Sequence, residues 1–129
     1  MISKELLSEV LGVKVLSLYT HASAEHIGYC FDESCGNDIS RQMEINIYEL
    51  AHKCKEWAYN LNMPLMSGYY NDKKYSDKDD KNEYKIYCIV KMYEYSSRIW
   101  IGTIWHEIFN ADTEPEAIFE ACQWILENK

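Results

Sequence analysis

Apolar residues recur at helical spacing in three segments of the chain. In one of them, residues 46 to 61, the apolar side chains fall within an arc of about 120° at 3.6 residues per turn. This stripe consists of Ile47, Leu50, Ala51, Cys54, Trp57, Ala58 and Leu61. Asn46 and Glu49 have capping-box spacing, with Asn in place of Ser or Thr. The pattern predicts an amphipathic helix that begins after Asn46.

A second helix is predicted for residues 113 to 129. Thr113 and Glu116 have capping-box spacing. The apolar residues of this segment span more than half of the helix circumference, and they leave a narrow polar stripe of Glu116, Glu120, Gln123 and Glu127. We therefore expect a deeply packed helix, with Trp57 and Trp124 buried between the helices and a sheet.

The remaining elements are a short helix and several strands. Residues 3 to 11 predict a short N-terminal helix, with Ser3 as its N-cap and Gly12 as its stop. Alternating, β-branched and aromatic runs predict strands at residues 13–20, 26–32, 64–70, 84–95 and 98–109, the last two joined by Ser96-Ser97. Residues 33–40 and the charged residues 71–83 are predicted to be loops, the latter solvent-exposed.

These elements predict one α+β domain that spans residues 1 to 129. It would contain an antiparallel sheet of four to five strands, packed against two main helices and accompanied by the short N-terminal helix. A chain of 129 residues can bury most of its apolar surface without disulfides or metals.

The predicted hairpin of residues 84 to 109 has two different faces. If Tyr95 pairs with Arg98 and Tyr87 with His106, one face is aliphatic and carries Ile86, Cys88, Val90, Met92, Ile99, Ile101 and Trp105. The other face carries the candidate binding residues Tyr87, Lys91, Tyr93, Tyr95, Arg98, Trp100 and His106. Aromatic rings interleaved with cations can stack on planar groups or bind anions. The same residue types are also typical of ordinary solvent-facing strand positions.

Composition and charge narrow the classes of partner. The chain carries 21 acidic and 13 basic residues, a formal net charge of −8. Direct binding to duplex nucleic acid draws on phosphate neutralisation, so an acidic chain is poorly suited to it. Basic protein surfaces remain suitable partners. Eleven tyrosines raise the aromatic share to 14%, and tyrosine is common where proteins bind other molecules. The sequence also leaves open whether the protein forms a homodimer.

The cysteines and the N-terminal segment predict a cytoplasmic location. The five cysteines are an odd number, and three of them lie within apolar patterns as small buried side chains. The opening "MISKELLSEVLG" is too short and too charged for a secretory signal. No apolar run reaches transmembrane length, so no membrane association is expected.

No motif assigns a catalytic residue, a metal or a cofactor. His21, His26, Cys30 and Cys35 are borderline or soft ligands, but their spacing matches no common zinc motif, and we expect no zinc. His52 and Cys54 are two residues apart on a helix and point in different directions. His52 belongs to an exposed ridge flanked by Glu49 and Glu56. The "WHEIF" segment lacks the second histidine of a metalloprotease helix. An enzyme is therefore not expected.

Two helical segments carry a resemblance. "INIYELAHKCKEWAYNL" and "TEPEAIFEACQWILEN" resemble segments of small proteins of unknown function that bacteriophages and prophages encode, which end in an "EAIFxACxWIL" helix. The matching positions are Ile47, Leu50, Trp57, Ile118, Cys122, Trp124 and Leu126. The resemblance implies a phage or prophage origin, and with it a location in the cytoplasm of a bacterial host. It carries over no site residue.

The leading functional hypothesis is an acidic, non-enzymatic binding protein that acts on a host or phage protein, with inhibition of a host defence system as one role. The alternative is a domain that binds a small ligand or nucleotide on the aromatic and basic hairpin face. Binding without turnover favours the first hypothesis. A saturable shift of the melting temperature by a small molecule favours the second.

Overall fold

The structure is a computed structural model that describes residues 2–20, 23–31, 43–71, 84–96 and 99–128. For Thr20 and for residues 70–71, 84–85, 92–96 and 99–107 only the backbone is described. Within these ranges the fold is α+β, with three helices and two three-stranded antiparallel sheets. The elements are α1 (Lys4–Leu11), β1 (Ser17–Thr20), β2 (His26–Cys30), β3 (Met43–Asn46), α2 (Ile47–Asn60), β4 (Leu65–Asn71), β5 (Tyr84–Ser96), β6 (Ile99–Ala111) and α3 (Glu114–Asn128).

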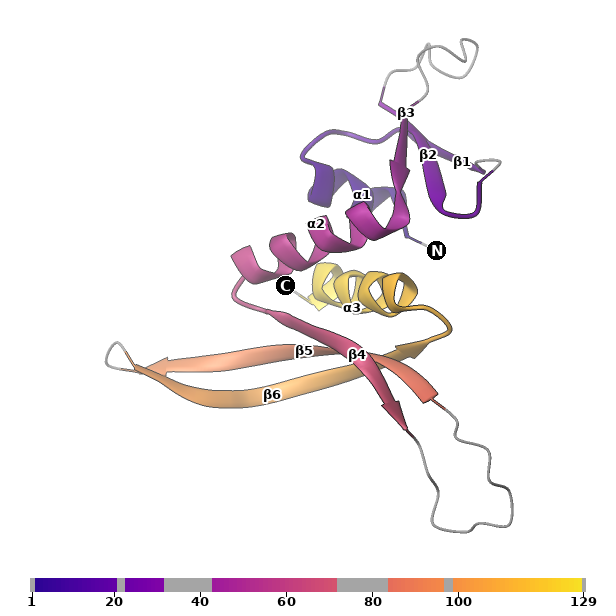
Figure 1. Ribbon diagram of the computed structural model, residues 1–129. Coiled ribbons are helices and arrows are strands. Elements are labelled where there is room, and N and C mark those ends of the chain that lie inside the picture. Colours follow the sequence, from indigo (N-terminus) through magenta and orange to yellow (C-terminus); the bar gives the residue numbers. More distant parts are fainter. Residues whose placement is uncertain (1, 21–22, 32–42, 72–83, 97–98, 129) are drawn as a thin grey trace, which may run out of the picture.

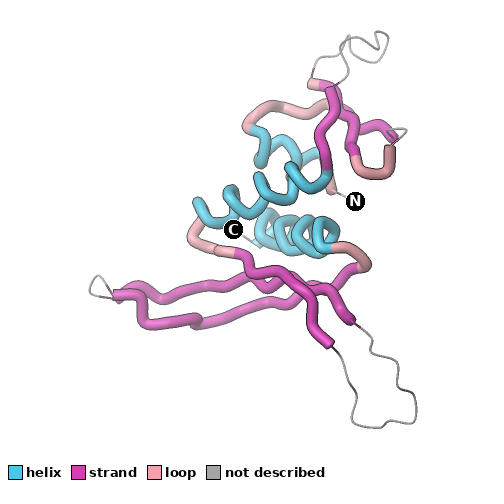
Figure 2. The backbone as a smooth tube through the Cα atoms, in the orientation of Figure 1, coloured by secondary structure: helices cyan, strands magenta, loops and turns pink. Residues whose placement is uncertain are grey.

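The elements are stacked in layers (Figures 1 and 2). The larger sheet, in the order β4-β5-β6, forms one end of the molecule, and α3 lies on one of its faces. Helices α2 and α1 lie beyond α3, and the smaller sheet, β1-β2-β3, forms the other end. The core lies between these layers and draws its fully buried side chains from all three helices and from β5: Leu6, Leu7, Leu50, Cys54, Cys88, Val90, Ile118, Cys122 and Ile125.

The three helices begin where their capping residues predict. The side chain of Ser3 accepts a hydrogen bond from the amide of Leu6, and that of Thr113 accepts one from Glu116. The side chain of Asn46 accepts from the amides of Tyr48 and Glu49 at 2.8 and 3.4 Å. These bonds satisfy amide groups that have no partner within their own helix.

Helix α3 is deeply packed, as its wide apolar surface predicts. Seven of its residues are buried: Pro115, Ala117, Ile118, Phe119, Ala121, Cys122 and Ile125. The polar stripe Glu116, Glu120, Gln123 and Glu127 is exposed or half-exposed. The prediction that Trp57 and Trp124 are buried is wrong, because both are only half-buried and pack against the edge of the core. The ring of Trp124 lies 6.3 Å from that of Phe109 on β6, centroid to centroid.

The prediction of one sheet with four to five strands is wrong. The described part of the chain instead forms two sheets, separated by helices, and β3 was not predicted. β3 has only four residues and runs directly into α2, so its own pattern is too short to mark it as a strand. It is defined by pairing with β2, in which Ile27 lies opposite Ile45. The loops predicted at 33–40 and 71–83 lie outside the described residues, apart from Asn71, which ends β4.

The hairpin of β5 and β6 is confirmed, but its predicted register is wrong. Tyr95 lies opposite Trp100 instead of Arg98, and Tyr87 lies opposite Asn110 instead of His106. The described pairing ends at Ser96 and Ile99. Between there and Met92 the register shifts twice, each time with one more residue on β6 than on β5. Such bulges cannot be seen in a pattern of alternation, which assumes equal steps on both strands.

Candidate functional site

The first candidate surface is the face of the larger sheet that lies opposite α3. Side chains alternate along a strand, and Cys88 and Val90 of β5 are fully buried on the α3 side. Met66, Tyr87, Ile89, Lys91 and Ile108 therefore share the opposite face, which we call the outer sheet face. Figure 1 shows that none of the described helices covers it.

An apolar row crosses all three strands of the outer sheet face. Met66 lies opposite Ile89, and Ile89 lies opposite Ile108. Ile108 is 51% exposed and Met66 is 41% exposed, whereas Ile89 in the middle is half-buried. An apolar row on an open sheet face is unusual, because such positions are normally polar.

The next row of the same face is built around a glycine. Gly68 on β4 lies opposite Tyr87 on β5, and Tyr87 lies opposite Asn110 on β6. A Cβ atom at position 68 would stand 3.2 Å from the Tyr87 hydroxyl oxygen, so this side chain lies across the glycine. The glycine thereby leaves room for the Tyr87 side chain.

The structure places only part of the predicted aromatic and basic cluster. Tyr87 and Lys91 lie on the outer sheet face, as predicted. The backbone of Lys91 lies opposite that of His106, a pairing that the sequence did not suggest. The side chains of the other predicted members lie outside the described residues: Tyr93, Tyr95, Arg98, Trp100 and His106.

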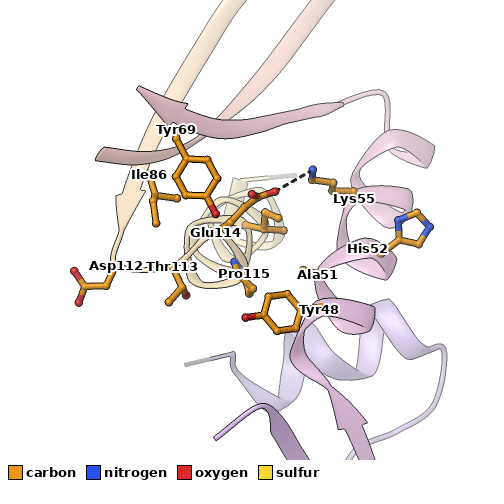
Figure 3. A pocket seen from close by; sticks show the side chains of 11 residues that line it. Tyr48, Ala51, His52, Lys55, Tyr69, Ile86, Asp112, Thr113, Glu114 and Pro115 are labelled. Atoms are coloured by element: carbon orange, nitrogen blue, oxygen red, sulfur yellow. Dashed lines mark ion pairs between the residues drawn. The ribbon is translucent and has the colours of Figure 1, made fainter. Parts of the chain in front are cut away.

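The second candidate is a pocket of about 440 Å³ at the first turn of α3 (Figure 3). Tyr48 from α2 and Tyr69 from β4 stand on opposite sides of that turn. Both rings are mostly exposed, at 59% and 63%. Its other lining residues are Ala51, His52, Lys55, Ile86, Asp112, Thr113, Glu114, Pro115 and Ile118. A volume of this size lies in the range of natural ligand sites.

Glu114 is the polar centre of this pocket. Its Oε1 atom accepts a hydrogen bond of 2.8 Å from the Ser67 hydroxyl on β4. The same oxygen lies 3.7 Å from the Lys55 ammonium on α2. Glu114 therefore joins β4, α2 and the start of α3 through one carboxylate. His52 lies at the exposed rim of the pocket, and its Nε2 atom lies 3.1 Å from the Oε1 atom of Glu56. Both side chains are exposed, as predicted for this ridge of α2.

The sequence did not predict this pocket. Tyr48 and His52 are one helical turn apart, and Thr113 marks the start of α3, so two parts of it had a visible signal. Nothing in the local pattern places Tyr69 of β4 beside them. That proximity depends on how the sheet packs on α2 and α3.

Three of the described cysteines provide structure in the core rather than a reactive site. Cys54, Cys88 and Cys122 carry free thiols and are fully buried, which confirms the prediction of three buried cysteines. The thiol of Cys122 lies 3.6 Å from the Cys54 carbonyl oxygen. The contact with Cys54 and burial raise the pKa of the Cys122 thiol, and burial raises the pKa of Cys88 to about 12. Thiols held in the neutral form are poor nucleophiles.

Cys30 is buried like the other described cysteines, but it differs from them in being disulfide-bonded. A disulfide-bonded sulfur is not available as a thiolate ligand. The ring of His26 lies 3.1 Å from the Ser23 hydroxyl. Among the described residues no group of three histidine, cysteine or acidic side chains is arranged to hold a metal ion. His21 and Cys35, the other two members of the proposed cluster, lie outside the described residues.

Comparison with known proteins adds no relative. No known protein family, curated protein or solved structure matches the chain. In the ranges that the structure describes, no helix has the length and apolar character needed to cross a membrane.

Proposed function

We propose that the protein is a non-enzymatic binding protein whose partner is another protein, and that the partner covers the outer sheet face. The observation that carries this proposal is the apolar row Met66, Ile89 and Ile108, which crosses a sheet face without a described helix over it. Burying an apolar side chain of this size is worth about 1.5–3 kcal/mol relative to exposure. Because Met66 and Ile108 are 41% and 51% exposed, a partner that covers the row gains roughly half of that free energy at each of them.

The surroundings of the row suit a protein interface. Tyr87 and Lys91 flank it on the same face, and tyrosine is enriched at interface centres. The net charge of −8 favours a partner with a basic surface through electrostatic steering. In line with the phage resemblance, we propose a host or phage protein in the bacterial cytoplasm as the partner. Inhibition of a host defence system is one role that such binding would serve.

Site-specific photo-cross-linking tests this proposal. Benzoyl-phenylalanine is incorporated at Ile108, and in a second version at Phe31, an aromatic residue directly after β2 that is 50% exposed. Both proteins are produced in bacterial cells and irradiated, and adducts are identified by mass spectrometry. We expect a discrete protein adduct from position 108 that position 31 does not form. An additional Met66→Lys substitution should abolish that adduct.

Two results would contradict the proposal. Identical adducts at positions 108 and 31 would mean that the outer sheet face has no preferred partner. An adduct that contains only two copies of this chain would make the face a self-association surface instead.

The alternative hypothesis, a small ligand or nucleotide on the same face, has its own measurement. Nucleotides and aromatic acids are titrated while the melting temperature is recorded. A saturable rise that Tyr87→Ala removes would support ligand binding on the outer sheet face.

A further inference from the structure

Strand β4 is an edge strand of the larger sheet, and its outward backbone groups have no strand partner among the described residues. The amide of Lys91 donates to the Pro64 carbonyl at 3.0 Å, which makes these opposite residues a hydrogen-bonded pair. Hydrogen-bonded and non-hydrogen-bonded pairs alternate along an antiparallel ladder. The N–H and C=O groups of Leu65, Ser67 and Tyr69 therefore point away from β5, toward the open edge.

Helix α2 leads into β4, and two hollows are lined by residues of both elements. The larger is the pocket of about 440 Å³, to which β4 contributes Tyr69. The smaller, of about 390 Å³, is lined by Lys55, Glu56, Tyr59, Asn60, Pro64 and Leu65 at the beginning of the strand. Lys55 borders both hollows. We call the two hollows together the α2–β4 groove.

The side chains of an added strand would enter this groove. The side chain of Ser67 points to the helix side, where it bonds to Glu114. Residues of an added strand that lie opposite Leu65, Ser67 and Tyr69 would point to the same side. Leu65 and Tyr69 are four residues apart, about 13 Å along a strand. Two side chains of the added strand, also four residues apart, would therefore reach one hollow each.

The charge of the groove favours a basic side chain. Three carboxylates line it, those of Glu56, Asp112 and Glu114, against the single ammonium of Lys55. In the larger hollow two exposed tyrosine rings stand beside two of these carboxylates. Aromatic faces and carboxylates both attract ammonium and guanidinium groups.

We propose that β4 and the α2–β4 groove bind an extended basic polypeptide as a fourth strand of the larger sheet, with a Lys or Arg side chain in the hollow between Tyr48 and Tyr69. Main-chain hydrogen bonds to an open edge supply affinity in this mode of recognition, and pockets for alternate side chains supply specificity. The edge and the outer sheet face are different surfaces, so this proposal goes beyond the proposed function and can fail independently of it.

Two synthetic nine-residue peptides test the proposal. Both alternate Thr and Val, and they differ only in an Arg or a Glu at the central position. We expect the Arg peptide to bind at least about tenfold more tightly than the Glu peptide, as measured by fluorescence anisotropy. Tenfold corresponds to a difference of about 1.4 kcal/mol in binding free energy between the two charges in the groove. At saturation, hydrogen exchange by NMR should slow at the amides of Leu65, Ser67 and Tyr69. The amides of Met66 and Gly68, which face β5, should already be protected in the free protein.

A matched pair of variants isolates the backbone contribution. Ser67→Pro removes the outward N–H, whereas Ser67→Ala removes the same hydroxyl and keeps that N–H. We expect Ser67→Pro to weaken binding of the Arg peptide about tenfold relative to Ser67→Ala. If Ser67→Pro does not fold, Glu114→Gln provides the second test, because Gln keeps an acceptor for Ser67 and removes the charge. The Glu114→Gln variant should bind the Arg peptide only about twofold more tightly than the Glu peptide, or less.

The outcomes separate this proposal from its competitors. Ile108→Lys alters only the outer sheet face, so it should bind the Arg peptide as the parent protein does. No saturable binding of either peptide up to about 1 mM would overturn the proposal. Equal binding of both peptides would also overturn it. Protection of Leu65, Ser67 and Tyr69 in the free protein, together with a dimer in sedimentation, would assign the edge to a second copy of the chain.

Discussion

The ring of Tyr19 on β1 lies directly over Gly28, its partner on β2. The Tyr19 hydroxyl then donates a hydrogen bond of 2.7 Å to the carbonyl of Met43 on β3. One side chain thus crosses all three strands of the smaller sheet. A Cβ atom at position 28 would collide with this ring, which explains why the position is a glycine.

Gly28→Ala should lower the free energy of unfolding by about 1–3 kcal/mol, the usual cost of overpacking. The cost should shrink when Tyr19→Ala is present, because the colliding ring is gone. Gly12→Ala is the control for a loss of glycine without a collision. Its φ of 71° disfavours alanine, but nothing lies near the added methyl group, so its cost should not change when Tyr19→Ala is present. Urea denaturation of the single and double variants measures these effects. Equal costs of Gly28→Ala in both backgrounds would disprove the contact.

Leu50→Ala should destabilise the protein by about 2–5 kcal/mol, because Leu50 is fully buried at the centre of the core. Tyr59 lies on the same helix and is 70% exposed, so Tyr59→Ala should cost less than about 0.5 kcal/mol. Chemical denaturation of both variants gives the comparison. A similar cost for the two would mean that α2 does not pack on α3 through its predicted stripe.

The stability of the protein should fall at alkaline pH through Cys88. Burial raises the pKa of this thiol from 9.0 to about 12. The stabilising effect of the neutral thiol is fully present below pH 9, and it is lost as the pH rises toward about 12, because the unfolded chain ionises first. One such group contributes a slope of up to about 1.4 kcal/mol per pH unit. Urea denaturation at pH 7, 9 and 10.5 should show a shallower slope for Cys88→Ala than for the parent.

Alkylation separates the two kinds of described cysteine. In denaturant without reductant, iodoacetamide should label Cys54, Cys88 and Cys122 and leave Cys30 unlabelled. After reduction Cys30 should react as well. Peptide mass spectrometry reads out each position. Disulfides persist mainly in oxidising compartments, so labelling of Cys30 without reductant in protein from the cytoplasm would mean that the bond does not form there.

Local chemistry determined where the helices begin and which of their faces are buried. The side chains of Ser3, Asn46 and Thr113 cap their own helices, and such bonds involve residues only two or three positions apart. The apolar stripe of α2 and the wide apolar surface of α3 directed both helices into the core. These features are visible in the sequence because each depends on neighbours along the chain.

The strand content was visible in the sequence, but the pairing was not. β-branched and aromatic runs marked β4, β5 and β6, whereas the division into two sheets depends on pairs far apart in sequence. In the β5–β6 hairpin the last described pair is Ser96 and Ile99, which puts Trp100 opposite Tyr95 instead of the predicted Tyr93, and two register shifts then move the partners of the earlier β5 residues further. A shift by one residue changes the partner of every later residue, and no local pattern encodes it.

The candidate surfaces show the same division. The sequence alone predicted that Tyr87 and Lys91 share one face of the sheet, because side chains alternate between the two faces along a single strand. The apolar row from Met66 to Ile108 needs the register of three strands at once. The pocket needs Tyr48, Tyr69 and Glu114, which come from α2, β4 and α3. Only tertiary packing decides such a meeting, because its free energy comes from burying the shared core between the elements rather than from any one segment.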